Sequence, residues 1–325
     1  MRAKRLHRWY QQVLSGFTES VKDGTFHQHN LRVRHRGKVK EIAVPILEPK
    51  HLGPQMAIDE KTIQGTNYTI LSNRQTNKIA LMAATLKTNE LMTLMNRFDT
   101  KQRMAVRSLS RDMALHYDWL GREAFMNAYH VIDKFHVVRH VLEQLQAVRI
   151  RYRQIALARR REAQQRKTKY SEKLLSNGET VLQLLARSRG LLFLYPEQWS
   201  EEQKERAGVL FKRYPEIQRA YALVLRIRKW FSVPKGSVIS SETRRRKQQQ
   251  LTTLLEELLQ SGIDEMRNIA AQLKRHIGRI TNYFIARETN AKAEALNRNI
   301  QRFIHMNYGA RNIDFFLYRI KIYFS

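Results

Sequence analysis

The chain has 325 residues and is strongly basic, with 59 Lys and Arg against 29 Asp and Glu and a formal net charge of +30. Its hydrophobic fraction of 42% is ordinary for a folded protein and excludes a disordered tail, and the absence of cysteine excludes disulfides, thiol nucleophiles and zinc sites built on thiolates. We therefore expect a folded protein that binds a polyanion, built as two domains or as one large domain with an insertion.

The N-terminal region, residues 1–50, is short and basic and lacks a hydrophobic signal segment. Its segment LRVRHRGKVKEIAVPIL has a basic residue at every second position, so a single extended strand would place all of them on one face. That face could follow a DNA backbone or could simply be solvated, and the sequence does not favour either interpretation. The basic residues are Arg32, Arg34, Arg36, Lys38 and Lys40.

Residues 51–145 have an α/β pattern. Three predicted strands, PQMAIDEKTI, NYTILSNR and KIALMAATL, are separated by turn residues and suggest an antiparallel meander. A helix over TNELMTLMNRF, a strand over AVRSLSRD, a helix from 113 to 126 and a strand over YHVIDKFHV follow. This order predicts a five-stranded sheet in which the first and fourth strands are neighbours.

Residues 146–275 are predicted to be an almost wholly helical insertion. The segment at 149–169 is a basic helix, with nine Lys or Arg against the single acid Glu162. Residues 276–325 return to a mixed pattern, with a helix over ETNAKAEALNRNIQRFIHMNYG. We expect the basic helix to contact a DNA backbone through residues that include Arg151, Arg159, Arg160 and Arg161.

Three carboxylates stand out by position: Asp59 in the first strand, Asp112 at the end of the fourth, and Glu294 on the helix after the all-helical segment. Two such charges about 5 Å apart repel by roughly 3 kcal/mol at an effective dielectric of about 20, so a cluster needs a cation to stay ionised. Oxygen ligands of this kind suit Mg²⁺ or Mn²⁺, and two ions can serve both the attacking and the leaving oxygen of a phosphodiester.

These residues resemble the DDE transposases of bacterial insertion sequences, in the ISL-three branch related to the Mutator-like group. The most specific similarity is DKFHVV at 133–138, which matches the family's Asp-x-x-His motif. The resemblance implies an RNase H-like α/β fold whose mixed five-stranded sheet is interrupted by a large all-helical insertion. The other segments that carry it are AIDEKTI, SLSRDMALHY, AYHVIDKFHVVRHV, TNAKAEALNRNIQRF and YGARNIDFFLYRI.

By this resemblance Asp59, Asp112 and Glu294 are the metal-binding catalytic triad. Glu294 is preferred to Glu288 because its T-N-x-x-x-E context matches the family. Among the other acids, Glu60 is expected to point to the opposite face of the sheet from Asp59. Asp118 is expected to be a surface charge or a helix cap.

The resemblance also implies supporting residues near the triad. Asp133 and His136 would position a DNA strand or the carboxylates, although such a pair is often structural. Asn290, Asn297 and Arg298 flank Glu294 as in the family pattern, and a solvated polar helix face is a nearly equal alternative.

The implied function is metal-dependent DNA cleavage and strand transfer on double-stranded DNA, both element ends and target. The alternatives are a nuclease of the same fold without strand transfer and an inactive DNA-binding derivative. No apolar run reaches the roughly 20 residues that cross a bilayer, and we expect a cytoplasmic, nucleoid-associated bacterial protein. Neither the family's N-terminal zinc motif nor its helix-turn-helix is found in this sequence. We therefore expect that recognition of the element ends is supplied by a separate small DNA-binding protein or was lost by truncation, and we expect a dimer or larger synaptic assembly.

Overall fold

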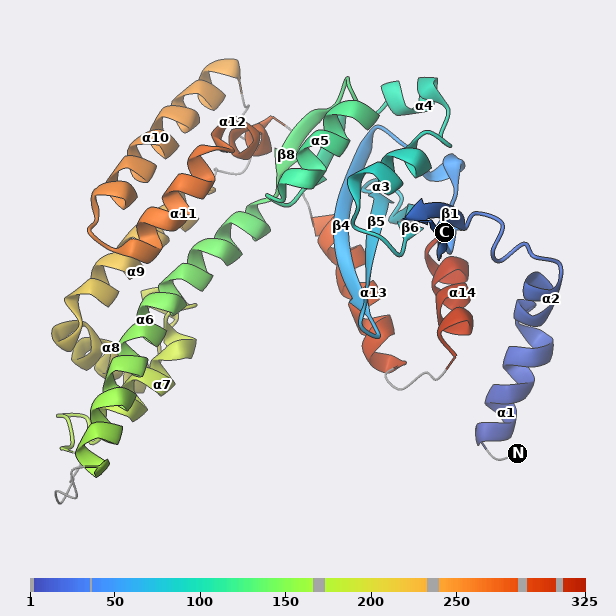
Figure 1. Cartoon of the computed structure of the whole chain (residues 1–325). Coiled ribbons are helices and arrows are strands. Elements are labelled where there is room, and N and C mark those ends of the chain that lie inside the picture. Colours follow the sequence, from blue (N-terminus) through green and yellow to red (C-terminus); the bar gives the residue numbers. More distant parts are fainter. Residues whose placement is uncertain (1–2, 36, 166–172, 233–239, 286–290, 308–311) are drawn as a thin grey trace. The chain divides into compact units, whose positions relative to one another are not determined.

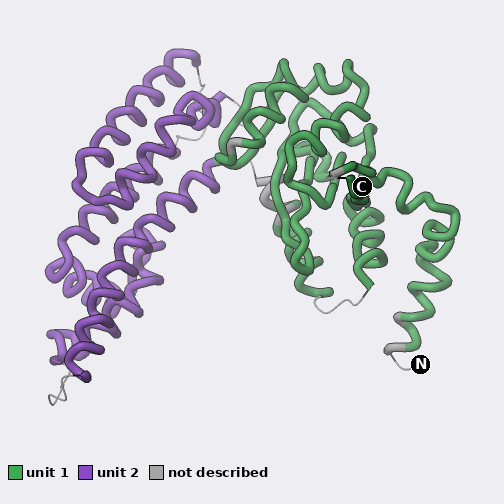
Figure 2. Tube along the Cα trace, in the orientation of Figure 1, with its two compact units in different colours: residues 1–133, 286–325 green, residues 134–285 purple. Residues whose placement is uncertain are grey.

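The computed structural model describes residues 3–35, 37–165, 173–232, 240–285, 291–307 and 312–325 (Figure 1). The chain divides into two compact units, shown in Figure 2: residues 1–133 together with 286–325, and residues 134–285. The first unit is therefore interrupted in the sequence by the whole of the second. Among the described helices, none is long and apolar enough to cross a membrane.

The first unit is built on a six-stranded mixed sheet of order β3-β6-β5-β4-β7-β8. Strands β4, β5 and β6 form the expected antiparallel meander, and β7 pairs in parallel with both β4 and β8. The predicted five-stranded sheet with adjacent first and fourth strands is confirmed, and the short β3 adds a sixth strand beside β6. The strands are β3 (Ile46–Leu47), β4 (Gln55–Ile63), β5 (Thr66–Asn73), β6 (Lys78–Ala83), β7 (Ser108–Arg111) and β8 (Tyr129–Ile132).

Helices cover both faces of this sheet (Figure 1). One face packs on α3 (Thr88–Met95) and α5 (Leu115–Ala124) through residues such as Ile58 and Leu71, while α4 (Thr100–Met104) leads into β7. The other face packs on α13 (Ala291–Met306) and α14 (Ile313–Phe324) through residues such as Ile63 and Ile70. Because side chains alternate along a strand, each position of β4 can be assigned to one of these two faces.

The basic N-terminal segment forms a hairpin, so the prediction of one strand with five basic residues on one face is wrong. Strands β1 (Leu31–His35) and β2 (Lys38–Ile42) pair antiparallel, with Gly37 at a φ of +78° in the turn between them. Arg32 and Arg34 stand opposite Glu41 and Val39, so Lys38 and Lys40 lie on the other face. Arg36 lies outside the described residues. The hairpin follows α1 (Ala3–Trp9), η1 (Tyr10–Leu14) and α2 (Phe17–Lys22), and η2 (Pro49–His51) precedes β4.

The second unit is helical in its described residues, as the sequence predicts. Its longest helix, α6 (Lys134–Gln165), begins earlier than expected, because β8 ends at Ile132 and the Asp-x-x-His motif turns directly into the helix. The basic segment is therefore the second half of a helix whose first half buries Val137, Val141 and Leu145. The other helices are α7 (Val181–Leu191), η3 (Pro196–Gln198), α8 (Glu201–Arg213), α9 (Pro215–Trp230), α10 (Ser241–Gln260), α11 (Asp264–Lys274), α12 (Ile277–Thr281) and η4 (Asn282–Phe284).

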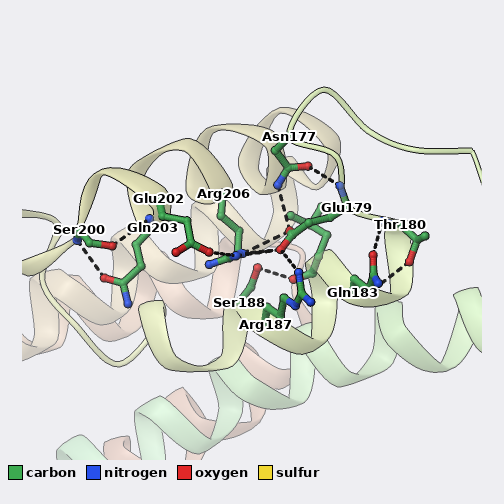
Figure 3. A network of polar contacts seen from close by, with 11 residues as sticks. Asn177, Glu179, Thr180, Gln183, Arg187, Ser188, Ser200, Glu202, Gln203 and Arg206 are labelled. Atoms are coloured by element: carbon green, nitrogen blue, oxygen red, sulfur yellow. Dashed lines mark hydrogen bonds and ion pairs between the residues drawn. The ribbon is translucent and has the colours of Figure 1, made fainter.

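A buried carboxylate ties two of these helices together. Glu179, just before α7, accepts hydrogen bonds from Arg206 on α8 at 2.8 and 3.0 Å and from Arg187 on α7 at 3.1 Å (Figure 3). Capping boxes begin both helices, one at Thr180 and one at Ser200. The helical unit thus has its own polar framework in addition to its apolar core.

Candidate active site at the ends of the parallel strands

Asp59 and Asp112 meet at the carboxyl ends of two neighbouring parallel strands. The register pairs Gln55 with Ser108 and Ala57 with Ser110. Continued by two residues, this register places Asp112, which directly follows β7, beside Asp59 on β4. Neighbouring strands are about 4.8 Å apart and paired residues share a face, so both carboxylates belong to the same edge of the sheet. The strand order that the sequence predicted is therefore sufficient to bring the two together.

Asp59 projects from the sheet face that α13 and α14 cover. It stands opposite Ile70 on β5 and two positions from Lys61, and Ile63 continues the same side of the strand. Its carboxylate accepts a hydrogen bond from the backbone N–H of Glu60 at 2.8 Å and lies 3.2 Å from Nζ of Lys61. Both side chains of this pair are only about one-fifth exposed, at 21% and 19%. Lys61 is thus a positive charge beside the site that the sequence alone did not single out.

Asp112 is held in a tight turn after β7. Its Oδ1 accepts a hydrogen bond from the backbone N–H of Ala114 at 2.8 Å. On the other face of the sheet, the buried Arg111 side chain donates to the backbone oxygens of Asp112 at 3.0 Å and Ala114 at 3.3 Å. The same guanidinium forms an ion pair with Asp118 on α5. Arg111 therefore fixes the backbone of the turn from which the Asp112 carboxylate projects.

The position of Asp118 corrects an expectation. The sequence predicted a surface charge or a cap, but Asp118 is only 9% exposed and serves as the counterion of Arg111. The physical reason is that a buried arginine in a strand needs an anionic partner, and α5 packs on that face of the sheet. No local pattern in the sequence shows this pair, because the burial of Arg111 follows only from the packing of α5 on the sheet.

Asp133 lies at the same edge of the sheet. The register that pairs Arg111 with Ile132 would place Asp133 next to Asp112 when continued by one residue, and the N–H of Asp133 donates to the oxygen of Arg111 at 3.4 Å. The Asp133 side chain is buried. His136 is in the first turn of α6, partly exposed and in edge-to-face contact with the ring of Phe135. The motif is therefore split between the end of a strand and the start of a helix, and does not lie on a strand.

The third candidate, Glu294, lies on α13, but its side chain falls outside the described residues. Two residues later on the same helix, Leu296 is buried with Ile300 in the core on the Asp59 face of the sheet. Asn290 and Glu288 lie in the undescribed segment 286–290, and the side chain of Asn297 is also not described. Arg298 is exposed.

Glu60 points to the face of the sheet opposite Asp59, as strand alternation predicts. Its carboxylate is 3.2 Å from Nε2 of His116 on α5, which places it on the face opposite Asp59. Next to this pair, the hydroxyl of Tyr117 contacts that of Thr69 at 3.1 Å, and burial raises the pKa of Tyr117 well above its usual value. These contacts attach α5 to the sheet and assign Glu60 to a structural role.

The residues at the sheet edge fit a hard divalent cation. Asp59 and Asp112 each offer carboxylate oxygens, the ligands that Mg²⁺ and Mn²⁺ prefer, and a backbone N–H holds one oxygen of each carboxylate. Within the part of the chain that the structure describes, no three His, Asp or Glu side chains form a metal-binding group. A third ligand from Glu294 is compatible with this result, because its side chain is outside that part.

The basic residues expected to contact DNA differ in their surroundings. Arg159, Arg160 and Arg161 are exposed on α6, whereas Arg151 pairs with Glu216 and, at 2.8 Å, with Glu265. The hydrogen bonds from Arg151 to these two acids raise its pKa further. Tertiary packing thus supplies counterions for Arg151, and its contact with a DNA backbone stays a prediction from the sequence.

A comparison with models of protein families finds one family that matches most of the chain. A model of the ISL-three group of DDE transposases, described as "Transposase", matches residues 56–320. The match begins in β4 just before Asp59, includes the entire helical unit and ends in α14. No curated protein and no solved structure matches the chain.

Proposed function

Because the chain belongs to the ISL-three family of DDE transposases, we propose that Asp59, Asp112 and Glu294 are its catalytic triad. The protein is a transposase, and its substrate is DNA. The parallel register of β4 and β7 supports the assignment of the first two residues. The assignment of Glu294 is supported by the packing of α13 on the face from which Asp59 projects, through Leu296 and Ile300.

Enzymes of this family use divalent metal ions, and we infer that two Mg²⁺ or Mn²⁺ ions bind between these carboxylates. Held by these carboxylates, such ions would supply Lewis-acid charge for the attacking oxygen of water or of a DNA 3′-hydroxyl and for the leaving oxygen. The same site then serves cleavage at the element end and transesterification into the target. Catalysis rests on position and charge, as in phosphoryl transfer generally.

The protein's own groups hold this site in three ways. The β-strands fix the spacing of Asp59 and Asp112, and Arg111 fixes the turn at Asp112. Lys61 lies close enough to Asp59 to offset part of the negative charge of the cluster. Asp133, at the next strand end, and His136 are proposed to position the scissile strand or the carboxylates.

We also propose that the active assembly is a dimer or larger, since two element ends must be held together during strand transfer. Recognition of those ends by a separate small protein stays a prediction from the sequence. The same is true of the association with the nucleoid.

The test is a cleavage and joining assay on a DNA fragment that carries one element end, with a target plasmid present. We expect Asp59→Asn, Asp112→Asn and Glu294→Gln each to abolish cleavage and joining in Mg²⁺ while duplex binding is retained. Glu288→Gln is the matched control for the third acid and is expected to remain active. Calorimetric titration with Mn²⁺ provides a readout apart from activity, and Asp59→Asn should weaken metal binding.

Near-normal nicking by either Asp variant would contradict the assignment. Loss of activity in Glu288→Gln with activity kept in Glu294→Gln would move the third ligand to Glu288. Cleaved ends without any joined product would show a nuclease.

A further inference from the structure

A groove of about 950 Å³ lies within the helical unit, between α6 and the end of α7. Gln146 on α6 donates to the backbone oxygen of Arg189 at 3.2 Å, and Arg149, one turn later on α6, donates to that of Leu185 at 2.7 Å. The residue numbers of the partners rise along α6 and fall along α7, so the two helices run antiparallel. This packing fixes the width of the groove.

The groove has an apolar lining that is open to solvent. Its α6 wall is a stripe at helical spacing that runs from Phe135 through Leu142 to Ile150, and Phe193 follows the end of α7 on the other side. Phe135 is 54% exposed, Ile150 44% and Phe193 38%. Large exposed apolar side chains that gather in a concave site are typical of a binding site.

The groove is also strongly basic. Four arginines line it against a single acid, Glu143, and that acid already accepts a hydrogen bond from Arg139 at 2.8 Å. Arg149 is buried and donates to two neutral oxygens, those of Gln146 and Leu185. Burial, together with the positive charges of Arg153 and Arg189, lowers the pKa of Arg149. The arginines therefore repel one another, and an anion between them would relieve this repulsion.

We propose that this groove binds unpaired nucleotides of the DNA substrate, with bases against Phe135 and Phe193 and phosphates at Arg153 and Arg189. The combination of aromatic rings and arginines suits single strands, because unstacked bases offer faces to the rings and phosphates offer charge. In a duplex the base faces are covered by their neighbours, so the rings would gain little. A purely apolar partner would leave the arginine charges unpaired.

The proposal rests on the DNA substrate of the family and adds a second site to the proposed function. The two can fail separately, because binding to the groove needs no metal and no catalytic carboxylate. Phe135 is itself the third residue of the Asp-x-x-His motif at 133–136, so the groove lining includes a residue of that motif.

The experiment measures fluorescence anisotropy of the full chain without divalent metal, using a labelled oligothymidine of about 12 nucleotides and a blunt duplex of equal length. Phe193→Ala should weaken single-strand binding by about 30-fold, the middle of the range for removal of one base-stacking ring, and change duplex binding less than about twofold. The matched control is Ile155→Ala, since Ile155 is 41% exposed on α6 but outside the groove.

A second pair of variants tests the charges. The double variant Arg153→Gln with Arg189→Gln should make the slope of log affinity against log salt concentration for the single strand less steep. The expected reduction in its magnitude is about 1.4, or about 0.7 for each phosphate that the two arginines neutralise. The control double variant, Arg219→Gln with Arg245→Gln, removes exposed arginines of the same unit outside the groove and should leave this slope unchanged.

A 2-aminopurine in the oligonucleotide provides a direct readout of stacking, because its fluorescence should fall on binding to the wild-type chain and not on binding to Phe193→Ala. Equal losses for single strand and duplex, or a Phe193→Ala variant that behaves as Ile155→Ala, would overturn the proposal. Circular dichroism of each variant checks that the helices are intact.

Discussion

The buried pair of Arg111 and Asp118 connects the stability of the first unit to the position of Asp112. In the variant Asp118→Ala the guanidinium of Arg111, whose side chain is fully buried, loses its anionic partner. Its hydrogen bonds to the backbone oxygens of Asp112 and Ala114 remain possible, at 3.0 and 3.3 Å in the wild-type chain. The variant therefore removes from a buried charge the carboxylate with which it forms an ion pair.

The expected loss in the free energy of unfolding follows from this burial. Removal of one partner from a buried ion pair costs roughly 3–5 kcal/mol. Since the Asp118 side chain is 13% exposed, we expect a value near the lower end, about 3 kcal/mol. For a unit of this size that corresponds to a fall in Tm of roughly 6–12 °C.

The assay is urea and thermal unfolding of Asp118→Ala, with Asp264→Ala as control, because Asp264 forms an exposed pair with Arg267 and its removal should have little effect. The double variant Arg111→Leu with Asp118→Leu should regain most of the stability but cleave DNA slowly, since the guanidinium that bonds the backbone of the turn at Asp112 is then absent. The reasoning is refuted if Asp118→Ala is no less stable than Asp264→Ala, or if the double variant cleaves at the wild-type rate.

Three further predictions follow from the helical unit. Burial alone would raise the pKa of Glu179, but hydrogen bonds from Arg206, Arg187 and Asn177 bring this pKa below its usual value. The ionised carboxylate therefore stabilises the fold at pH values above the pKa of the unfolded chain, about 4.3. The free energy of unfolding should fall as the pH drops below this value. Glu179→Gln should lower the free energy of unfolding at pH 7 and flatten this acid dependence, which urea titrations from neutral to acidic pH would measure. Ser200→Ala removes the cap of α8, where Oγ accepts from the N–H of Gln203 at 3.3 Å, and should cost about 1 kcal/mol, with Ser200→Gly costing less. Replacement of Arg159, Arg160 and Arg161 by Gln should weaken duplex binding. It should also reduce the magnitude of the slope of log affinity against log salt concentration by about 0.9 for each phosphate that is no longer neutralised. Arg151→Gln should mainly lower the free energy of unfolding, because the partners of Arg151 are Glu216 and Glu265.

Much of the fold could be predicted because hydrophobic periodicity and turn residues determine it locally. The meander of β4 to β6 and the neighbouring β7 were expected from segment order, and the pairing of β4 with β7 confirms it. The N-terminal hairpin was not predicted, because basic residues at period two look the same along one strand or two. The chain forms a hairpin and not a single strand because Gly37 adopts a positive φ of +78°, which permits the turn.

The candidate site shows the same division between local and tertiary information. The edge at which Asp59 and Asp112 meet follows from strand order alone. Lys61 and Asp118 gain their roles only from the packing of the sheet and of α5, which no local pattern displays. For the same reason Arg151 looked like one of several similar arginines on a basic helix, although two acids from other helices surround it.

The interruption of the first unit has a consequence for its synthesis. The helices α3 and α5, which pack on one face of the sheet, are made together with β4 to β8. The core on the other face, with Ile70, Ile79 and Met82, is completed only when α13 and α14 join Phe17 and Phe26 of the N-terminal segment. At ribosomal speeds of about 5–20 residues per second, synthesis of residues 134–285 takes roughly 8–30 s, and α13 and α14 cannot complete that core before then. The growing chain therefore passes through a stage that chaperones and proteases can recognise, and its catalytic unit matures only after the helical unit has left the ribosome.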